Sequence, residues 1–175
     1  MRSIRFILIL LFLQISINTY SQLNHKHYLL MGRIDLSEED YSEAILNFNL
    51  AITAKPADFE AYFLRGIAKY SLNDFNGAVD DFSKAISIHP LYTRAYHYRG
   101  ISNDRLGNYA DAIADYKKAI ELDPYDPDLH IALGSTRLHL NEFESAILCF
   151  DTALIIKPDN SYAYINRGVA KRYLT

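Results

Sequence analysis

A single period of 34 residues governs this sequence from about residue 25 to its end. Pro, Gly and Ala each recur at that interval without insertion or deletion. The residues in phase are Pro56, Pro90, Pro124 and Pro158; Gly32, Gly66, Gly100, Gly134 and Gly168; Ala44, Ala78, Ala112 and Ala146; and Ala51, Ala85, Ala119 and Ala153. A fixed period of this length is typical of a solenoid, in which each unit buries its apolar face only against its neighbours.

Each unit is expected to contain two amphipathic helices. In the second unit, Ala61, Leu64 and Ala68 recur at three- and four-residue spacing, and Ala78 and Phe82 begin a similar series,. The turns between the two helices are marked by Asn73-Asp74, Gly107-Asn108 and Asn141-Glu142. The recurring Pro predicts the end of each unit, because its ring cannot continue a helix.

These residues resemble the pattern of the tetratricopeptide repeat (TPR) family. The resemblance is carried by six positions of the unit. The first helix has an aromatic residue and a Gly four residues after it. The second helix has an Ala, a second aromatic residue four positions after that Ala, and another Ala three positions further on, and a Pro closes the unit. The first aromatic residue is Tyr28, Tyr62, Tyr96 or Tyr164, and the second is Phe48, Phe82, Tyr116 or Phe150. The chain departs from the family, which prefers Trp where Tyr or His130 stands, and a large residue where Arg65, Arg99 and Arg167 stand.

The resemblance covers everything after about residue 24 and implies an all-α fold, a right-handed superhelical solenoid of antiparallel helix pairs. It predicts a short segment, 22–24, and four full repeats, 25–58, 59–92, 93–126 and 127–160. The first helix of a fifth repeat, 161–175, follows. We expect this helix to cap the array; the alternative is an exposed edge that accepts another protomer, which would give a homo-oligomer.

The glycine of each first helix is expected to have a packing role. Gly costs about 1 kcal/mol of helix propensity relative to Ala, so its presence in all five units needs a compensating contact. We predict that the partner helix approaches closely there, and that the aromatic residue between the paired alanines fills the remaining space.

Cys149 is the only cysteine, so the chain cannot form an internal disulfide,. Its counterparts in the other units are the polar residues Asn47, Asp81 and Asp115. This pattern predicts that Cys149 lies near a surface.

Residues 1–21 differ from the repeats and are typical of a secretory signal peptide. Arg2 and Arg5 precede an apolar run that starts at Phe6, and polar and small residues follow up to a predicted cleavage site after Ser21. The alternative is a membrane anchor formed by uncleaved residues 6–17, but a span needs about 20 apolar residues. We therefore expect a periplasmic or secreted protein with no stable membrane span after cleavage.

Charge and motifs exclude several classes of function. Without residues 1–21 the chain has 16 basic and 21 acidic residues, and it contains no run of Lys and Arg, which disfavours nucleic-acid binding,. It contains neither HExxH nor CxxC, and its glycines form no phosphate-binding loop,. We therefore expect no enzyme activity, no metal and no cofactor.

In TPR proteins the first helices line a concave groove that commonly receives an extended peptide or a partner helix. Here the residues expected to line that groove are Leu29, Leu30, Arg33, Phe63, Leu64, Ile67, Tyr70, His97, Tyr98, Ile101, Arg105, Ile131, Ala132, Ser135, His139, Ile165 and Asn166. The alternative is that Phe63, Leu64 and Ile67 are core residues.

The resemblance does not extend to the carboxylate clamp of the family. Leu29 and Phe63 stand where the clamp requires Lys, and Arg33 and Ile67 stand where it requires Asn. The sequence therefore predicts a non-enzymatic interaction scaffold or adaptor outside the cytoplasm that binds an apolar peptide or partner helix. The alternative is a self-assembling structural solenoid joined through the incomplete last repeat.

Overall fold

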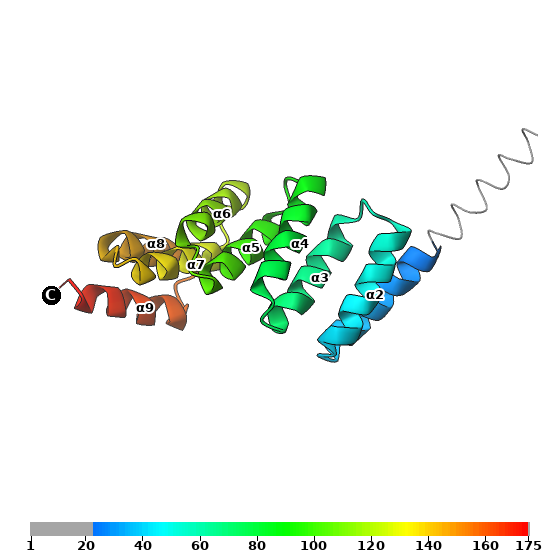
Figure 1. The fold of residues 1–175 in the computed structure, drawn as a ribbon. Coiled ribbons are helices and arrows are strands. Elements are labelled where there is room, and N and C mark those ends of the chain that lie inside the picture. The colour runs from blue at the N-terminus through cyan, green and yellow to red at the C-terminus, as the bar shows by residue number, and fades with distance from the viewer. Residues whose placement is uncertain (1–22, 175) are drawn as a thin grey trace, which may run out of the picture.

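The computed structural model describes residues 23–174, and within that range every regular element is a helix (Figure 1). The predicted signal peptide lies outside the described residues. Residues 23–37 form the first helix described. The others are α2 (Tyr41–Ala54), α3 (Phe59–Ser71), α4 (Phe75–Ile88), α5 (Thr93–Arg105), α6 (Tyr109–Leu122), α7 (Pro127–His139), α8 (Phe143–Ile156) and α9 (Ser161–Arg172). The all-α solenoid predicted from the period is confirmed.

The helices succeed one another along the array (Figure 1), and from α2 to α9 each packs against the next in sequence. In addition, α3 contacts α5, α5 contacts α7 and α7 contacts α9, whereas α4, α6 and α8 do not contact one another. The first helices of the units therefore lie closer together than the second helices. This difference makes the side formed by α3, α5, α7 and α9 the concave side of the array.

The packing within each unit centres on a ring set against a glycine. Phe48, Phe82, Tyr116 and Phe150 are almost fully buried on the second helices, each between two fully buried alanines. A Cβ atom built on Gly100 would lie 2.7 Å from Cε1 of Tyr116, and the matching glycines of the other three units give 2.6 or 2.7 Å. The predicted packing role of the glycine is thus confirmed, and the group that requires it is the ring rather than the partner backbone.

The turn between the two helices of a unit requires one residue with positive φ. That position is Glu39, Asn73, Gly107 or Asn141, with φ of 64°, 61°, 78° and 59°. Gly and Asn tolerate this conformation well, and Glu tolerates it less. The predicted turns at 73–74, 107–108 and 141–142 are confirmed, and so is the placement of all four prolines between helices.

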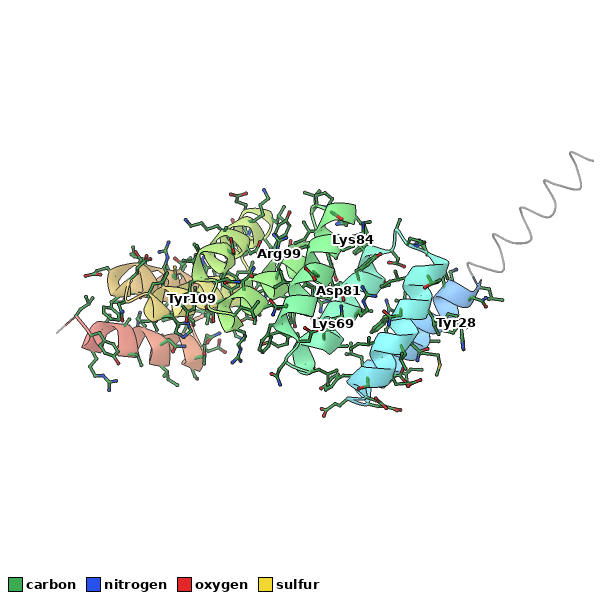
Figure 2. The ribbon with its side chains drawn as sticks, in the orientation of Figure 1. Tyr28, Lys69, Asp81, Lys84, Arg99 and Tyr109 are labelled. Atoms are coloured by element: carbon green, nitrogen blue, oxygen red, sulfur yellow. The ribbon has the colours of Figure 1, made fainter. Side chains whose placement is uncertain are left out.

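Partly buried arginines link the second and third units to the unit before each, which explains one departure from the family pattern. Arg65 donates through Nε to Asp81 of its own unit at 2.8 Å and through Nη1 to Asn49 of the preceding unit. Arg99 repeats this with Asp115 and Ser83, at 2.9 and 3.0 Å (Figure 2). Each guanidinium therefore joins three consecutive helices.

The prediction for Cys149 is wrong: its side chain is buried, with 7% of its surface exposed. It packs with Leu133, Ala112 and Tyr116. Leu133 occupies the position of Arg65 and Arg99, so the fourth unit replaces an Arg–Asp pair by a Leu–Cys contact. Burial also raises the pKa of the Cys149 thiol, which keeps it neutral.

The glycine contact gives a matched test. Gly168 occupies the position of Gly100, but nothing lies within 4 Å of a Cβ atom built on it. We expect Gly100→Ala to lower the free energy of unfolding by about 1–3 kcal/mol through overpacking against Tyr116. Gly168→Ala should instead stabilise α9 by up to about 1 kcal/mol through helix propensity. Urea unfolding followed by circular dichroism measures both, and equal effects would contradict this account of the packing.

The Leu–Cys contact gives a second test. Cys149→Asp alone would bury a carboxylate beside Leu133, where the nearby Arg137 offsets its charge only in part, and we expect it to lower the free energy of unfolding by about 1–3 kcal/mol,. Adding Leu133→Arg supplies the partner found in the second and third units, so the double variant should recover a large part of that loss. A double-mutant cycle in urea measures the coupling. Additive losses would show that these two positions do not act as a pair.

Candidate functional site

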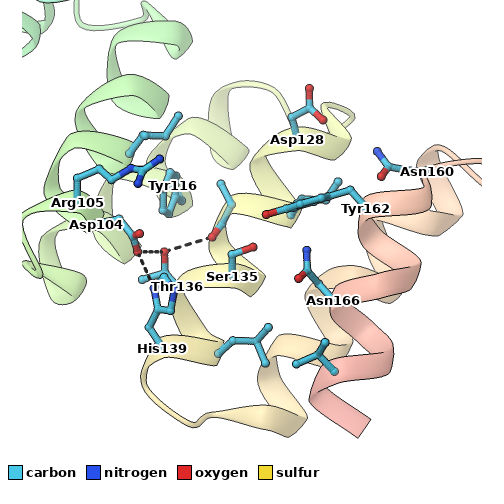
Figure 3. Close-up of a pocket in the computed structure, with 15 residues that line it drawn as sticks. Asp104, Arg105, Tyr116, Asp128, Ser135, Thr136, His139, Asn160, Tyr162 and Asn166 are labelled. Carbon is cyan, nitrogen blue, oxygen red and sulfur yellow. Dashed lines mark hydrogen bonds and ion pairs between the residues drawn. The ribbon is translucent and has the colours of Figure 1, made fainter. Parts of the chain in front are cut away.

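The concave side carries a groove between α5, α7 and α9, with a volume of about 880 Å³ (Figure 3). We call it the α5–α7–α9 groove. Its floor is α7, and its walls are α5 and α9. The residues that line it are Ile101, Asp104, Arg105, Tyr116, Asp128, Ile131, Ala132, Ser135, Thr136, Leu138, His139, Asn160, Tyr162, Asn166 and Val169.

Seven of the residues predicted from the sequence lie together in this groove. They are Ile101, Arg105, Ile131, Ala132, Ser135, His139 and Asn166. The groove opens at α7 because two side chains there are small. Ala132 stands at the repeat position of Leu64 and Tyr98, and Ser135 at that of Ile67 and Ile101.

The predicted residues of the earlier units are packed into the core instead. Phe63 is buried, with 1% of its surface exposed, so the prediction that it lines an open groove is wrong. Its ring lies 4.9 Å from that of Tyr92 and 5.7 Å from that of Tyr98, and the Arg94 guanidinium covers it at 4.9 Å. The partly buried Leu64, Ile67, Tyr70 and Tyr98 pack against the same cluster. Aromatic side chains therefore fill this half of the concave side.

Five further predicted residues lie outside the α5–α7–α9 groove. Leu29 packs against the cluster around Phe48. Leu30 and Arg33 are exposed, and Arg33 pairs with Glu60. His97 is partly buried beside Tyr98, and Ile165 is exposed on α9 without lining the groove.

Eight lining residues were not predicted from the sequence. They are Asp104, Tyr116, Asp128, Thr136, Leu138, Asn160, Tyr162 and Val169. Val169 stands at the repeat position of Ile101 and Ser135, and Asp128 and Tyr162 share the second position of their units. Extending the predicted positions by 34 residues would therefore have found Val169, whereas no predicted residue shares the position of Asp128 and Tyr162. Figure 3 shows Tyr162 extending from α9 across α7.

Polar contacts fix one wall of the groove. The Thr136 hydroxyl donates to Oδ1 of Asp104 at 2.6 Å, and Nδ1 of His139 lies 3.5 Å from the same oxygen (Figure 3). The ring of His139 also lies 5.5 Å from that of Tyr109. These contacts hold the Asp104 carboxylate at the junction of α5 and α7.

Burial and hydrogen bonds set the charge states near the groove. Burial lowers the pKa of His97 despite the opposing effect of Asp126 and Asp128, so His97 is neutral at pH 7. A hydrogen bond to the side chain of Tyr70 raises the pKa of Arg105. Burial raises the pKa of Tyr116 well above its usual range, so its hydroxyl stays protonated.

The Asn166 side chain leaves a hydrogen-bond donor unused. Its Nδ2 is buried and has no hydrogen-bond partner among the described residues. A buried donor without a partner costs about 1–3 kcal/mol, so such a group is a natural contact for an acceptor on a ligand. Asn166 lies on the α9 wall beside Tyr162 (Figure 3).

The described residues were also compared with the requirements of other kinds of site. Within residues 23–174, no three His, Cys, Asp or Glu side chains are arranged to hold a metal ion. Over the same range, no helix combines the length and apolar character that crossing a bilayer requires. The groove offers polar groups set among apolar side chains, an arrangement that suits the binding of a ligand,.

Comparison with solved structures supports the fold. MamA from Desulfovibrio magneticus RS-1 is 20% identical, with a TM-score of 0.81 over 86% of this chain and 85% of that chain. YrrB, described as a TPR protein with an unusual peptide-binding site, is 22% identical, with a TM-score of 0.76 over 82% and 74%. The first TPR of Spaghetti (RPAP3), bound to the HSP90 peptide SRMEEVD, is 20% identical, with a TM-score of 0.65 over 66% and 92%.

Comparison with sequence families decides the assignment. No curated protein matches the chain. The family pattern described as Tetratricopeptide repeat matches residues 29–93, 66–127 and 105–166. These matches cover most of the described helices, so the chain belongs to the tetratricopeptide repeat family.

Proposed function

We propose that this protein is a non-enzymatic interaction scaffold outside the cytoplasm, and that its α5–α7–α9 groove binds an extended peptide segment of a partner protein. The observation that carries the proposal is the groove itself, whereas the concave side around Phe63 is packed with the protein's own aromatic side chains. Its volume of about 880 Å³ suits several side chains of a peptide,.

The lining of the groove favours an extended segment over a partner helix. A helix satisfies its own backbone groups, whereas an extended segment presents free carbonyl groups. The unpartnered Nδ2 of Asn166 can donate to one such carbonyl,. Tyr162 is 59% exposed and supplies a large apolar surface beside that amide,. Peptide binding by YrrB and by the first TPR of Spaghetti shows that this fold can serve the role, without identifying the partner here.

The proposed location outside the cytoplasm rests on residues 1–21. Their basic start, apolar run and polar end have the organisation of a secretory signal peptide,. The lone, buried Cys149 is compatible with an oxidising compartment, because it offers no exposed thiol for unwanted disulfides,.

A matched pair of variants tests the groove. Tyr162→Ala removes the exposed ring from the groove, and we expect it to weaken binding of a captured partner about tenfold, which corresponds to about 1.4 kcal/mol. Tyr125→Ala removes a ring that is 80% exposed in the α6–α7 turn outside the groove, and it should leave affinity unchanged. Partner candidates would come from proximity labelling in the native compartment, and titration of purified proteins would give the dissociation constants.

Equal affinity of the two variants would contradict binding in the groove.

Light scattering at two protein concentrations addresses the alternative function, self-assembly through 161–175. The exposed Tyr164 and Ile165 and the open position at Gly168 are the features that favour that alternative. We expect the molar mass of a monomer at both concentrations. A molar mass that rises with protein concentration, and that Ile165→Asp returns to the monomer value, would support self-assembly.

The location has its own test. After export, the mass of the mature protein should correspond to a chain that begins at Gln22, because cleavage is expected after Ser21,. A protein that keeps Met1 and sediments with membranes would instead show that residues 6–17 act as an anchor.

A further inference from the structure

We propose that the α5–α7–α9 groove selects a peptide segment that carries a Lys or Arg side chain flanked by apolar residues, with the cationic head at the carboxylate of Asp128 and a second hydrogen-bond donor of the segment at Asp104, near the other end of α7. This inference rests on the proposed function, since it specifies the chemistry of the segment bound there. It differs from recognition of an acidic peptide end, for which the chain lacks the required Lys and Asn residues.

The first argument is the balance of charge around the groove. Asp104 and Asp128 contribute two carboxylates, and Arg105 contributes the only Lys or Arg side chain among the lining residues. One guanidinium against two carboxylates leaves the Asp and Arg side chains of the lining with a net negative charge.

The second argument is that Asp128 lacks an ion-pair partner within residues 23–174. Its backbone N–H donates to Asp126 at the start of α7, but no Lys, Arg or His lies within 4.0 Å of its carboxylate oxygens. The neighbouring ring is His97, which burial keeps neutral. Asp128 is exposed at the rim of the groove, where an incoming cation can reach it (Figure 3).

The third argument is the orientation of Asp104. Both of its side-chain contacts, with Thr136 and His139, are made through Oδ1. Among the described residues, Oδ2 has no hydrogen bond, so it remains able to accept one from a ligand. The contacts to Oδ1 hold this acceptor in place before the ligand arrives.

The apolar part of the lining suits the rest of such a side chain. Ile101 and Ile131 lie beside Ala132 on the floor, and Val169 lies on the α9 wall. Lys and Arg bury their methylene stems against apolar surface while the charged head stays at a polar edge. An Asp or Glu side chain is shorter and would place its charge beside carboxylates of the same sign.

Three fluorescein-labelled dodecapeptide pools test the selection. One central position is fixed as Lys, Glu or Leu, and the remaining positions exclude charged residues and Cys. By anisotropy, we expect the Lys pool to bind the full chain about tenfold more tightly than the Glu pool. The difference should shrink as salt is raised, because exposed charges are screened.

Two asparagine variants locate the effect. Asp128→Asn should reduce the preference for the Lys pool at least about fivefold. Asp80→Asn changes an exposed carboxylate of α4 outside the groove, and it should leave the preference intact. Since the chain has no Trp, Tyr162→Trp provides a single fluorescent reporter that shows whether the peptides enter the groove.

The outcomes separate this inference from the proposed function. If the Lys and Leu pools bind equally and Tyr162→Ala weakens both, the groove binds peptides and the selection for a cation is wrong. If the Glu pool binds best, the selection is reversed and the inference is overturned. If no pool changes the emission of the Tyr162→Trp variant, peptide binding in the groove is itself refuted.

Discussion

The contact between a second-helix ring and a first-helix glycine is the constraint on which the array depends. At 2.6 or 2.7 Å from the position of an added Cβ, the ring leaves no space for any other residue at the glycine. The two helices of a unit can therefore meet in only one register, and repetition of that register every 34 residues sets the path of the solenoid,. The arginine contacts then join the second and third units to the unit before each, since Arg65 and Arg99 both reach back to the preceding second helix.

The fourth unit shows how such a contact can be replaced. Burying an Arg without its Asp, or an Asp without its Arg, would leave an uncompensated charge, which is strongly destabilising. Leu133 and Cys149 change both members together, so the apolar pair fills the same space without that cost. The chain thus uses two solutions for the same interface, one ionic and one apolar. The prediction that Cys149 lies near a surface was wrong because it used only the polar residues at the same repeat position. It did not take into account Leu133, the residue packed against Cys149.

The repeat made most of the fold predictable. Gly, Ala, aromatic and Pro residues each have a role that depends on local geometry, so their period was enough to predict the helices, the turns and the solenoid. The groove was harder, because whether a concave side chain is exposed depends on the size of its neighbours. Phe63 is covered because Tyr92, Tyr98 and Arg94 are large enough to reach it. Ile131, Ala132, Ser135 and His139 of α7 do line the groove, but the repeat pattern alone does not show that the small size of Ala132 and Ser135 is what opens it.

The position of the groove also follows from these side-chain volumes. Leu64 and Tyr98 close the concave side between the second and third units, and Ala132 at the same repeat position opens it at the fourth. A groove formed in this way has walls held by the solenoid, because α5, α7 and α9 each pack against a second helix behind them. Binding of the proposed segment would then cost the protein little conformational entropy, and its specificity would rest on a few polar groups such as Asp104 and Asn166. Changing those groups would alter the ligand while the ring and glycine contacts maintain the fold.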